Sequence, residues 1–188
     1  MRVYIVRHGE SETNRDGKWT GWLNVRLTDK GREDAKKAGK ILAGVKFDKI
    51  YASDLDRAKE TAQNAIPGCT LEENKLIREI NVGNIAGKPL DVIGDEERKL
   101  IAKNGYADFD GETYEVFRQR VTDFMKILEE CDGENIAVFS HAGWLRAFLN
   151  AVTGTVIPRN NLLCDNCTVG IFEYKEGTWM LHSWINLD

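Results

Sequence analysis

Cysteine, proline and histidine are scarce in this chain of 188 residues, which has four cysteines, three prolines and three histidines. Four unevenly spaced cysteines are too few for a disulfide framework in a chain of this length. No segment approaches the roughly 20 consecutive apolar residues that a transmembrane helix needs. Near the N-terminus only Val3–Val6 are continuously apolar before Arg7 and His8, so the pattern does not match a secretory signal. We therefore expect a cytoplasmic protein that does not bind membranes.

An excess of basic charge is also missing, because 26 Lys and Arg face 30 Asp and Glu and leave a net charge of −4. This balance argues against a nucleic-acid-binding protein, whose binding face is usually basic. A small anionic substrate stays compatible with it, because the field inside a pocket depends on where charges lie and not on their sum. The length predicts a single domain over residues 1–188.

Two cysteines at close spacing, Cys164 and Cys167, allow two chemical roles to be considered. A zinc site needs two more donors, and no other cysteine or histidine stands at ligand-like spacing. A redox pair is expected at a helix N-terminus, whereas Cys167 leads into the strand-like segment 168–172. We favour buried or loop thiols over either role.

Hydrophobic periodicity predicts strands that alternate with helices. Three short apolar runs read as buried strands and each is followed by a helical pattern, and the chain ends in a hairpin that turns at Gly177. This order predicts a three-layer α/β/α sandwich with a mainly parallel central sheet. The expected strands are 2–6, 47–51, 135–139, 168–174 and 179–185, and the expected helices are 28–42, a segment capped by Ser53-Asp54 that runs to Ile66, 89–102, 112–131 and 144–152.

Polar residues follow each of the three predicted parallel strands. In open α/β sheets the ligand crevice lies beyond the carboxyl ends of the strands. Arg7 and His8 follow the first strand, Arg57 lies shortly after the second, and His141 follows the third. One histidine in such a place is adequately explained by chance, but the whole set is not. We expect these four side chains to converge on one rim of the sheet.

Phosphoryl transfer is the chemistry that such a cluster suits. Arginine offers bidentate hydrogen bonds to phosphate oxygens and stays charged at any working pH. A neutral imidazole, held by a hydrogen bond at its other nitrogen, can attack phosphorus and form a phosphohistidine. The leaving alkoxide then needs a proton from a carboxylic acid in the pocket. This scheme needs neither a metal ion nor a cofactor.

Five sequence blocks resemble those of the histidine phosphatase superfamily, in its phosphoglycerate-mutase-like branch. They occur in the family's order, on the expected elements, and the resemblance extends from Val3 to about Tyr174. A single Arg-His-Gly tripeptide would be weak evidence, whereas five ordered blocks are strong. The blocks are Arg7-His8-Gly9-Glu10 with Thr13-Asn14, Ser53 to Ala62, Leu76 to Gly83, Gly111 to Val121, and Ser140-His141-Ala142-Gly143 with Leu145-Arg146.

The resemblance implies a role for each matched residue. It makes His8 the phosphorylated nucleophile and Glu79 the general acid and base, and spacing alone would not choose Glu79 over Glu72 or Glu73. It implies that the phosphoryl group is bound by Arg7, Arg57 and His141, with Asn14 as a further donor. Asn14 could equally be a turn residue, and for Glu112 a structural role at a helix N-terminus is at least as well supported as catalysis.

Some sequence features resemble the mutases of this family, and others favour its phosphatases. The segment from Thr20 to Thr28 is similar to cofactor-dependent phosphoglycerate mutases, in which the Thr20-Gly21 pair would lie against the substrate carboxylate. The chain lacks the His-Tyr-Gly run that follows the Glu in those mutases, and also their long insertion before the second His. A phosphatase must admit water, which a shorter chain with fewer covering segments allows. We favour a phosphatase, with a mutase-type phosphotransferase as the alternative.

Specificity is expected from the segments 15–22 and 82–110, which would cover the rim. The second contains Ile85, Tyr106 and Phe109, so a partly apolar leaving group would fit. Trp19 and Trp22 are either lid residues or packing for their loop. The expected partner is a small phosphorylated metabolite.

Two other classes of protein remain as alternatives. One is a metal-dependent hydrolase with His8, His141, Glu10 and Asp54 as ligands, although these residues form no tight metal motif. The other is a silent phosphate-binding module, which would have no need of Glu79. A homodimer formed through the final hairpin or a sheet edge is possible, but no sequence feature requires it.

Overall fold

The first strand shows how the sheet is buried on both faces. The computed structural model describes residues 1–187. In β1 (Arg2–Arg7), Val3 and Ile5 enter one hydrophobic core, while Tyr4 and Val6 enter a second. Successive side chains of a strand point to opposite faces, so an apolar run such as this one requires helices on both sides of the sheet.

Six strands form the sheet in the order β3-β2-β4-β1-β5-β6. Strands β3, β2, β4 and β1 pair in parallel, whereas β5 is antiparallel to both β1 and β6. The predicted sandwich with a mainly parallel sheet is confirmed, including the hairpin at Gly177. Besides β1, the strands are β2 (Lys49–Ala52), β3 (Glu72–Glu73), β4 (Asn135–Ser140), β5 (Val169–Lys175) and β6 (Thr178–Ile185).

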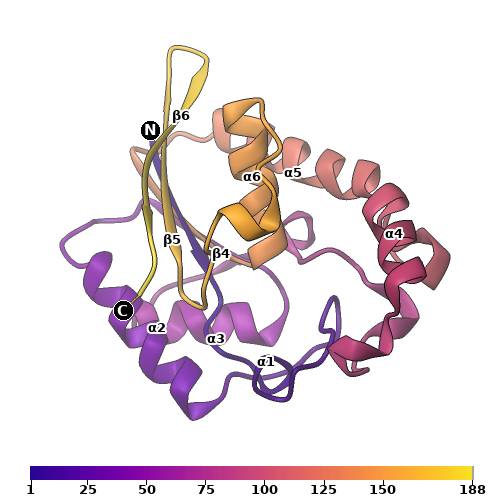
Figure 1. The fold of residues 1–188 in the computed structure, drawn as a ribbon. Helices are drawn as coiled ribbons and strands as arrows, with labels where there is room; N and C mark the ends of the chain where they lie inside the picture. The colour runs from indigo at the N-terminus through magenta and orange to yellow at the C-terminus, as the bar shows by residue number, and fades with distance from the viewer. Residues whose placement is uncertain (188) are drawn as a thin grey trace.

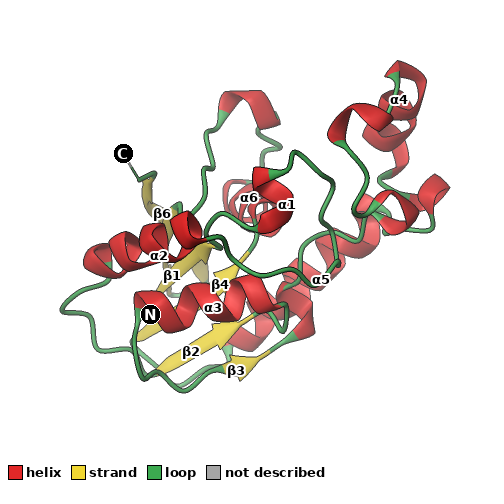
Figure 2. Ribbon diagram, turned by 90° about the horizontal axis from the view of Figure 1, so that it is seen from below, coloured by secondary structure: helices red, strands yellow, loops and turns green. Residues whose placement is uncertain are grey.

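Helices cover the sheet on both faces, as Figures 1 and 2 show. Small residues of α2 and α3 pack against one core, and the aromatic residues of α5 and α6 fill the other. Helix α4 lies apart from the sheet at the edge of the molecule (Figure 2). The helices are α1 (Glu12–Arg15), α2 (Asp29–Ile41), α3 (Asp56–Ala65), α4 (Asp95–Asn104), α5 (Tyr114–Glu129) and α6 (Ala142–Thr153), and short 3₁₀ turns include η1 (Lys75–Ile77), η2 (Gly83–Ile85), η3 (Leu90–Val92), η4 (Ala107–Phe109) and η5 (Arg159–Asn161).

Two helix predictions were wrong in detail. Ser53 and Asp54 do not cap α3, because the helix begins only at Asp56 and its N-cap residue, Leu55, makes no side-chain cap bond. Asp54 instead forms an ion pair with Arg78. The predicted helix 89–102 is divided into η3 and α4, because the backbone at Gly94 is extended.

Strand register brings the two predicted histidines together. Arg7 at the end of β1 is the register partner of Ser140 at the end of β4. His8 and His141, the next residues after these two strands, are therefore neighbours, and the His8 N–H donates to the Ser140 carbonyl at 2.9 Å. Within residues 1–187, no helix has the length and apolar character needed to cross a membrane.

Candidate active site

His8 is held in a defined tautomer at the end of β1. Its Nδ1 lies 2.7 Å from the Gly9 carbonyl oxygen, which can only accept, so Nδ1 carries the proton and Nε2 keeps its lone pair. The side chain is buried. Burial, and then the charges of Arg57 and Arg7, hold the His8 pKa well below 6.5. His8 is therefore a neutral base at physiological pH.

His141 lies against His8, with their ring centroids 5.1 Å apart. It is completely buried, and neither of its ring nitrogens has a hydrogen-bond partner among the described residues. Burial, and then the charges of Arg57 and Arg7, lower the His141 pKa well below 6.5. A buried polar group without a partner costs free energy, so both nitrogens are available to a ligand that enters this space.

Two arginines complete the cluster from different elements. The Arg57 side chain, near the start of α3, is completely buried and donates to the carbonyls of Gly21 at 2.8 Å and Leu23 at 2.9 Å. Burial lowers the Arg57 pKa to about 10, so the side chain is still charged at pH 7. Arg7 donates to the Cys164 carbonyl. In both side chains Nε is buried and has no partner among the described residues, which leaves a donor for an anion.

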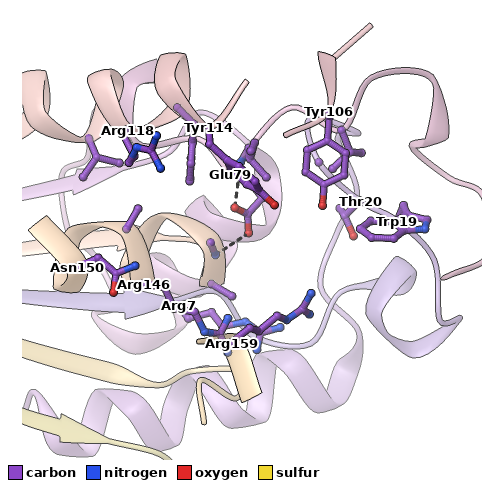
Figure 3. A pocket seen from close by; sticks show the side chains of 18 of the residues that line it. Arg7, Trp19, Thr20, Glu79, Tyr106, Tyr114, Arg118, Arg146, Asn150 and Arg159 are labelled. Atoms are coloured by element: carbon purple, nitrogen blue, oxygen red, sulfur yellow. Dashed lines mark hydrogen bonds between the residues drawn. The ribbon is translucent and has the colours of Figure 1, made fainter. Parts of the chain in front are cut away.

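Glu79 extends into the same space from the loop after η1. Its Oε1 accepts from the Ile80 N–H at 2.9 Å, and its Oε2 accepts from the Gly143 N–H at 3.0 Å (Figure 3). A Cβ atom at Gly143 would lie 2.2 Å from Glu79 Oε1. The absence of a side chain at Gly143 is thus what allows the carboxylate to lie against the start of α6.

An ion pair behind Glu79 fixes the loop that carries it. The carboxylate of Glu112 makes two hydrogen bonds of 2.7 Å with Arg120, which also donates to the Glu79 carbonyl at 3.1 Å. The indole N–H of Trp22 donates to the same carbonyl at 2.7 Å. Glu112 does not line the cavity, which supports a structural role for it over a catalytic one. Of the two roles considered for Trp22, packing of the loop is the one that its contact with the Glu79 carbonyl supports.

Asn14, Thr20 and Gly21 all line the cavity, but each also has a structural contact. The Asn14 Oδ1 accepts from the N–H of Ser11, where it completes a helix cap, and from the side chain of Asn166 at 3.2 Å. Thr20 Oγ1 lies 2.7 Å from Thr13 Oγ1. Gly21 presents its carbonyl to Arg57 and therefore helps to orient that guanidinium.

The cavity has a volume of about 1170 Å³ and extends well beyond the cluster. All the predicted catalytic and phosphate-binding residues line it except His141, whose ring lies against that of His8. Of the three residues proposed to receive an apolar leaving group, only Tyr106 lines it, because Ile85 is core and Phe109 packs against that core. Trp19 also lines the cavity and packs on Tyr106.

Sequence reasoning assigned no role to several residues that also line the cavity. Asn166 donates to the His8 carbonyl at 3.1 Å and to Asn14. Arg146 belongs to the last of the five family-like sequence blocks, but no function was assigned to it. Arg159 comes from a segment without the hydrophobic periodicity of a helix or strand. Only the three-dimensional arrangement brings these residues to the cavity, together with Arg118 and Tyr114.

The residues considered as metal ligands do not assemble. Glu10 contacts Thr28 and Asp54 is paired with Arg78, and neither carboxylate lines the cavity. Within residues 1–187 no group of three His, Cys, Asp or Glu side chains is placed to hold a metal ion. Cys164 and Cys167 are buried free thiols, and burial raises the Cys167 pKa to about 12.

The parallel strand ends, two neutral histidines, the buried Arg57 and the partly buried Arg7 define an α/β protein with a basic site suited to a tetrahedral oxyanion. The chain belongs to the histidine phosphatase superfamily, branch 1, whose family model matches residues 3–187. The resemblance seen in the sequence is therefore confirmed.

Relatives of the chain bear names of two kinds. "Probable phosphoglycerate mutase GpmB" of Salmonella arizonae is 28% identical over 98% of this chain and 90% of its own length. A solved structure from Escherichia coli K-12, described as a "putative alpha-ribazole-5'-P phosphatase", is 26% identical with a TM-score of 0.83, covering 97% of this chain and 94% of that one. A phosphoglycerate mutase structure from Thermus thermophilus is 25% identical with a TM-score of 0.76, covering 100% of both chains.

Proposed function

We propose that the protein is a metal-independent phosphomonoester hydrolase that acts through a phosphohistidine on His8. The observation that carries this proposal is the contact between His8 Nδ1 and the Gly9 carbonyl, which directs a neutral, unprotonated Nε2 away from the backbone. Beside it lie two arginines whose Nε atoms have no partner within residues 1–187, and a carboxylate on a fixed loop. We further propose a cytoplasmic location and a small phosphorylated metabolite as substrate, rather than nucleic acid or membrane.

In the first step, the lone pair of His8 Nε2 forms a bond to phosphorus, and the bond from phosphorus to the ester oxygen breaks. Arg7, Arg57 and His141 hold the phosphoryl oxygens, whose charge is spread in the transition state. The Glu79 carboxyl group gives its proton to the leaving alkoxide. Protonated Glu79 keeps an acceptor oxygen for the Gly143 N–H, so its place is retained when it acts as an acid.

In the second step, the Glu79 carboxylate takes a proton from a water molecule, whose oxygen attacks phosphorus. The bond between phosphorus and His8 Nε2 breaks, inorganic phosphate is formed, and neutral His8 and protonated Glu79 are regenerated. The long cavity that adjoins the cluster provides a path for water to this position. The path favours hydrolysis, because a mutase must keep its phosphoenzyme away from water until the substrate has reoriented.

Transfer of the phosphoryl group between two positions of a phosphoglycerate is the second candidate function. It is favoured by the names of the Salmonella and Thermus relatives and by Thr20 and Gly21 at the cavity wall. In this reaction the phosphohistidine would return its phosphoryl group to the substrate instead of to water.

The test is phosphate release from a panel of phosphomonoesters in excess EDTA, compared with conversion of 3-phosphoglycerate to 2-phosphoglycerate. We expect hydrolysis that survives EDTA and is lost in His8→Ala. His182→Ala is the matched control, because His182 is exposed on β6 and far from the cluster in the sheet order. Loss of activity on chelation would contradict the mechanism, and faster mutase turnover than hydrolysis would establish the second candidate.

A further inference from the structure

The cavity wall is strongly basic although the chain as a whole is acidic. Among residues 1–187, six cationic side chains line the cavity against one carboxylate, that of Glu79. Arg7 and Arg57 are explained by the phosphoryl group. Four cations have no part in the proposed hydrolysis, and they are Lys18, Arg118, Arg146 and Arg159.

Arg146 is partly buried on the α6 side of the cavity, and only some of its N–H donors have partners. One of its terminal nitrogens donates to the Leu162 carbonyl at 3.3 Å. Its Nε is buried and has no partner among residues 1–187, and no carboxylate pairs with the guanidinium in that part of the chain. A guanidinium has five N–H donors, so Arg146 has donors to offer to a ligand. Arg7 lines the same cavity.

Arg159 approaches the same place from η5. It lines the main cavity together with Tyr106 and Tyr114. Figure 3 shows Arg159 next to Arg7 and Arg146, below Glu79. The side chain is exposed, and no ion pair or side-chain hydrogen bond involves it within the described residues.

Arg146 and Arg159 also meet at a second hollow. This space has a volume of about 430 Å³, and Arg7, Arg146 and Arg159 line both it and the main cavity. Asp165 also lines this hollow, but within residues 1–187 it forms no ion pair with any of the three arginines. Three positive charges face one carboxylate, so they repel one another, and the repulsion is relieved when an anion binds between them. This hollow, beside the residues proposed to bind the phosphoryl group, is therefore suited to a second anionic group.

We infer that Arg146 and Arg159 form a second anion-binding subsite, so that the physiological substrate carries another acidic group besides the phosphate that is cleaved. This inference rests on the proposed phosphatase function and narrows its substrate class. The leaving alcohol bears a carboxylate or a second phosphate, and its body lies against the apolar wall formed by Tyr106, Tyr114 and Phe117. Arg7 binds the scissile phosphate, so the two anionic groups of the substrate lie on either side of this residue.

The test compares three series of synthetic esters with matched chains of roughly two to six carbons. All carry one phosphomonoester, and the other end is a hydroxyl, a carboxylate or a second phosphate. We expect kcat/KM at the best length to be about tenfold or more higher for an anionic end than for the hydroxyl, the effect of a charge-assisted hydrogen bond. The carboxylate and phosphate series decide which anion the subsite prefers.

Substitution then connects the preference to the two arginines. In Arg146→Gln and in Arg159→Gln, the ratio of kcat/KM for the anionic ester to kcat/KM for the hydroxyl ester should fall towards one. Arg159→Gln does not endanger folding, because this side chain is exposed in a loop. The matched control is Arg32→Gln, since Arg32 on α2 also donates to a backbone carbonyl, that of Leu27, but does not line the cavity. The control should keep the wild-type ratio.

The inference is overturned if the ratio is close to one at every length, or if both variants keep the wild-type ratio. If no ester is hydrolysed, the phosphatase proposal fails, and the subsite is tested by calorimetry with His8→Ala protein. That protein should bind the bisphosphate about tenfold more tightly than the hydroxyl ester, and Arg159→Gln should remove the difference. Equal binding of the two ligands would exclude the subsite without reference to turnover.

Discussion

The two ends of the cavity are built in different ways. The phosphoryl end, with Arg7, His8, Arg57 and His141, is formed by residues at the ends of β1 and β4 and at the start of α3, and its histidines and Arg57 are buried. The outer end is formed by α5, α6 and the loop around η5, and includes exposed residues such as Arg118, Val156 and Arg159. Strand register fixes the reacting groups, whereas surface segments form the outer end.

This difference assigns the reaction to the phosphoryl end of the cavity and the preference among substrates to the outer end. Register errors in a buried parallel sheet are costly, so the positions of His8 and His141 cannot change without loss of the core. The outer end is formed by helix and loop residues, which can differ between proteins that share the same reaction. Substitutions at the phosphoryl end should therefore affect every ester, and substitutions at the outer end should change the order of preference among esters.

The largest effect is expected at the carboxylate between the two ends. Glu79→Gln removes the proton donor, and kcat/KM for alkyl phosphates should fall by about 10² to 10⁴. The loss in kcat/KM should be much smaller for nitrophenyl phosphate, whose leaving group needs no proton. Values of kcat/KM across leaving groups of graded pKa measure this dependence, because kcat/KM reports the steps up to release of the leaving group and not the later attack of water. An equal loss in kcat/KM for all leaving groups would mean that Glu79 does not donate the proton.

The buried histidines should make stability depend on pH. Both have pKa values well below 6.5 in the folded protein, so below pH 6.5 the unfolded chain binds protons that the folded chain does not. The free energy of unfolding should therefore decrease as pH falls from 6.5 towards the folded pKa values, by about 2 to 3 kcal/mol at pH 5.5.

Urea denaturation at pH 7.5, 6.5 and 5.5 measures this decrease. The double variant His8→Gln/His141→Gln should show a flatter dependence, while His182→Gln should resemble the wild type because His182 is exposed. The same slope in all three proteins would refute the assignment of neutral histidines to the phosphoryl end.

The ion pair behind Glu79 should contribute to stability far more than a surface pair. The Arg120 and Glu112 side chains are only 14% and 10% exposed, so Glu112→Gln leaves a cation largely buried and should cost about 2 kcal/mol. Glu33→Gln is the control, because the Lys36–Glu33 pair is 55% and 66% exposed and should contribute less than about 0.5 kcal/mol. Chemical denaturation of both variants measures the two values, and similar costs would disprove the anchoring role of Glu112.

The smallest of these effects concerns the contact between Glu79 and α6. Gly143→Ala places a methyl group where Glu79 Oε1 lies, so the carboxylate must move and kcat should fall by about tenfold. Gly94→Ala is the control, because its Cβ would meet only the flexible end of the Glu97 side chain. Activity assays on folded protein decide the question. Unchanged activity in Gly143→Ala would show that this contact is dispensable.

The sequence revealed the phosphoryl end because local patterns encode it. An apolar strand followed by Arg7-His8, and another followed by His141, imply one rim as soon as the strands are parallel. Helix α2 was equally readable, since Thr28 accepts from the Gly31 N–H as an N-cap should. The order of the strands was not predicted, because sheet pairing depends on packing between distant segments.

The outer end escaped prediction for a physical reason. Arg146 and Arg159 are 13 positions apart on different elements, and a loop that turns at Gly154 returns Arg159 to the cavity. Asp54 was misread as a cap because its partner, Arg78, is distant in sequence. Trp22 showed no sign of its bond to the Glu79 carbonyl. Such tertiary contacts have no periodic signal.

The most direct test of the central claim is a rapid-quench experiment with an ester labelled with ³²P in its phosphoryl group. The wild type should yield protein-bound label that is stable in alkali and labile in acid, and peptide mapping should place it on the peptide that contains His8. With labelled nitrophenyl phosphate as substrate, the Glu79→Gln variant should accumulate more protein-bound label than the wild type, because attack of water on the phosphohistidine is slowed. The absence of any bound label during turnover, or a label on another residue, would contradict the account.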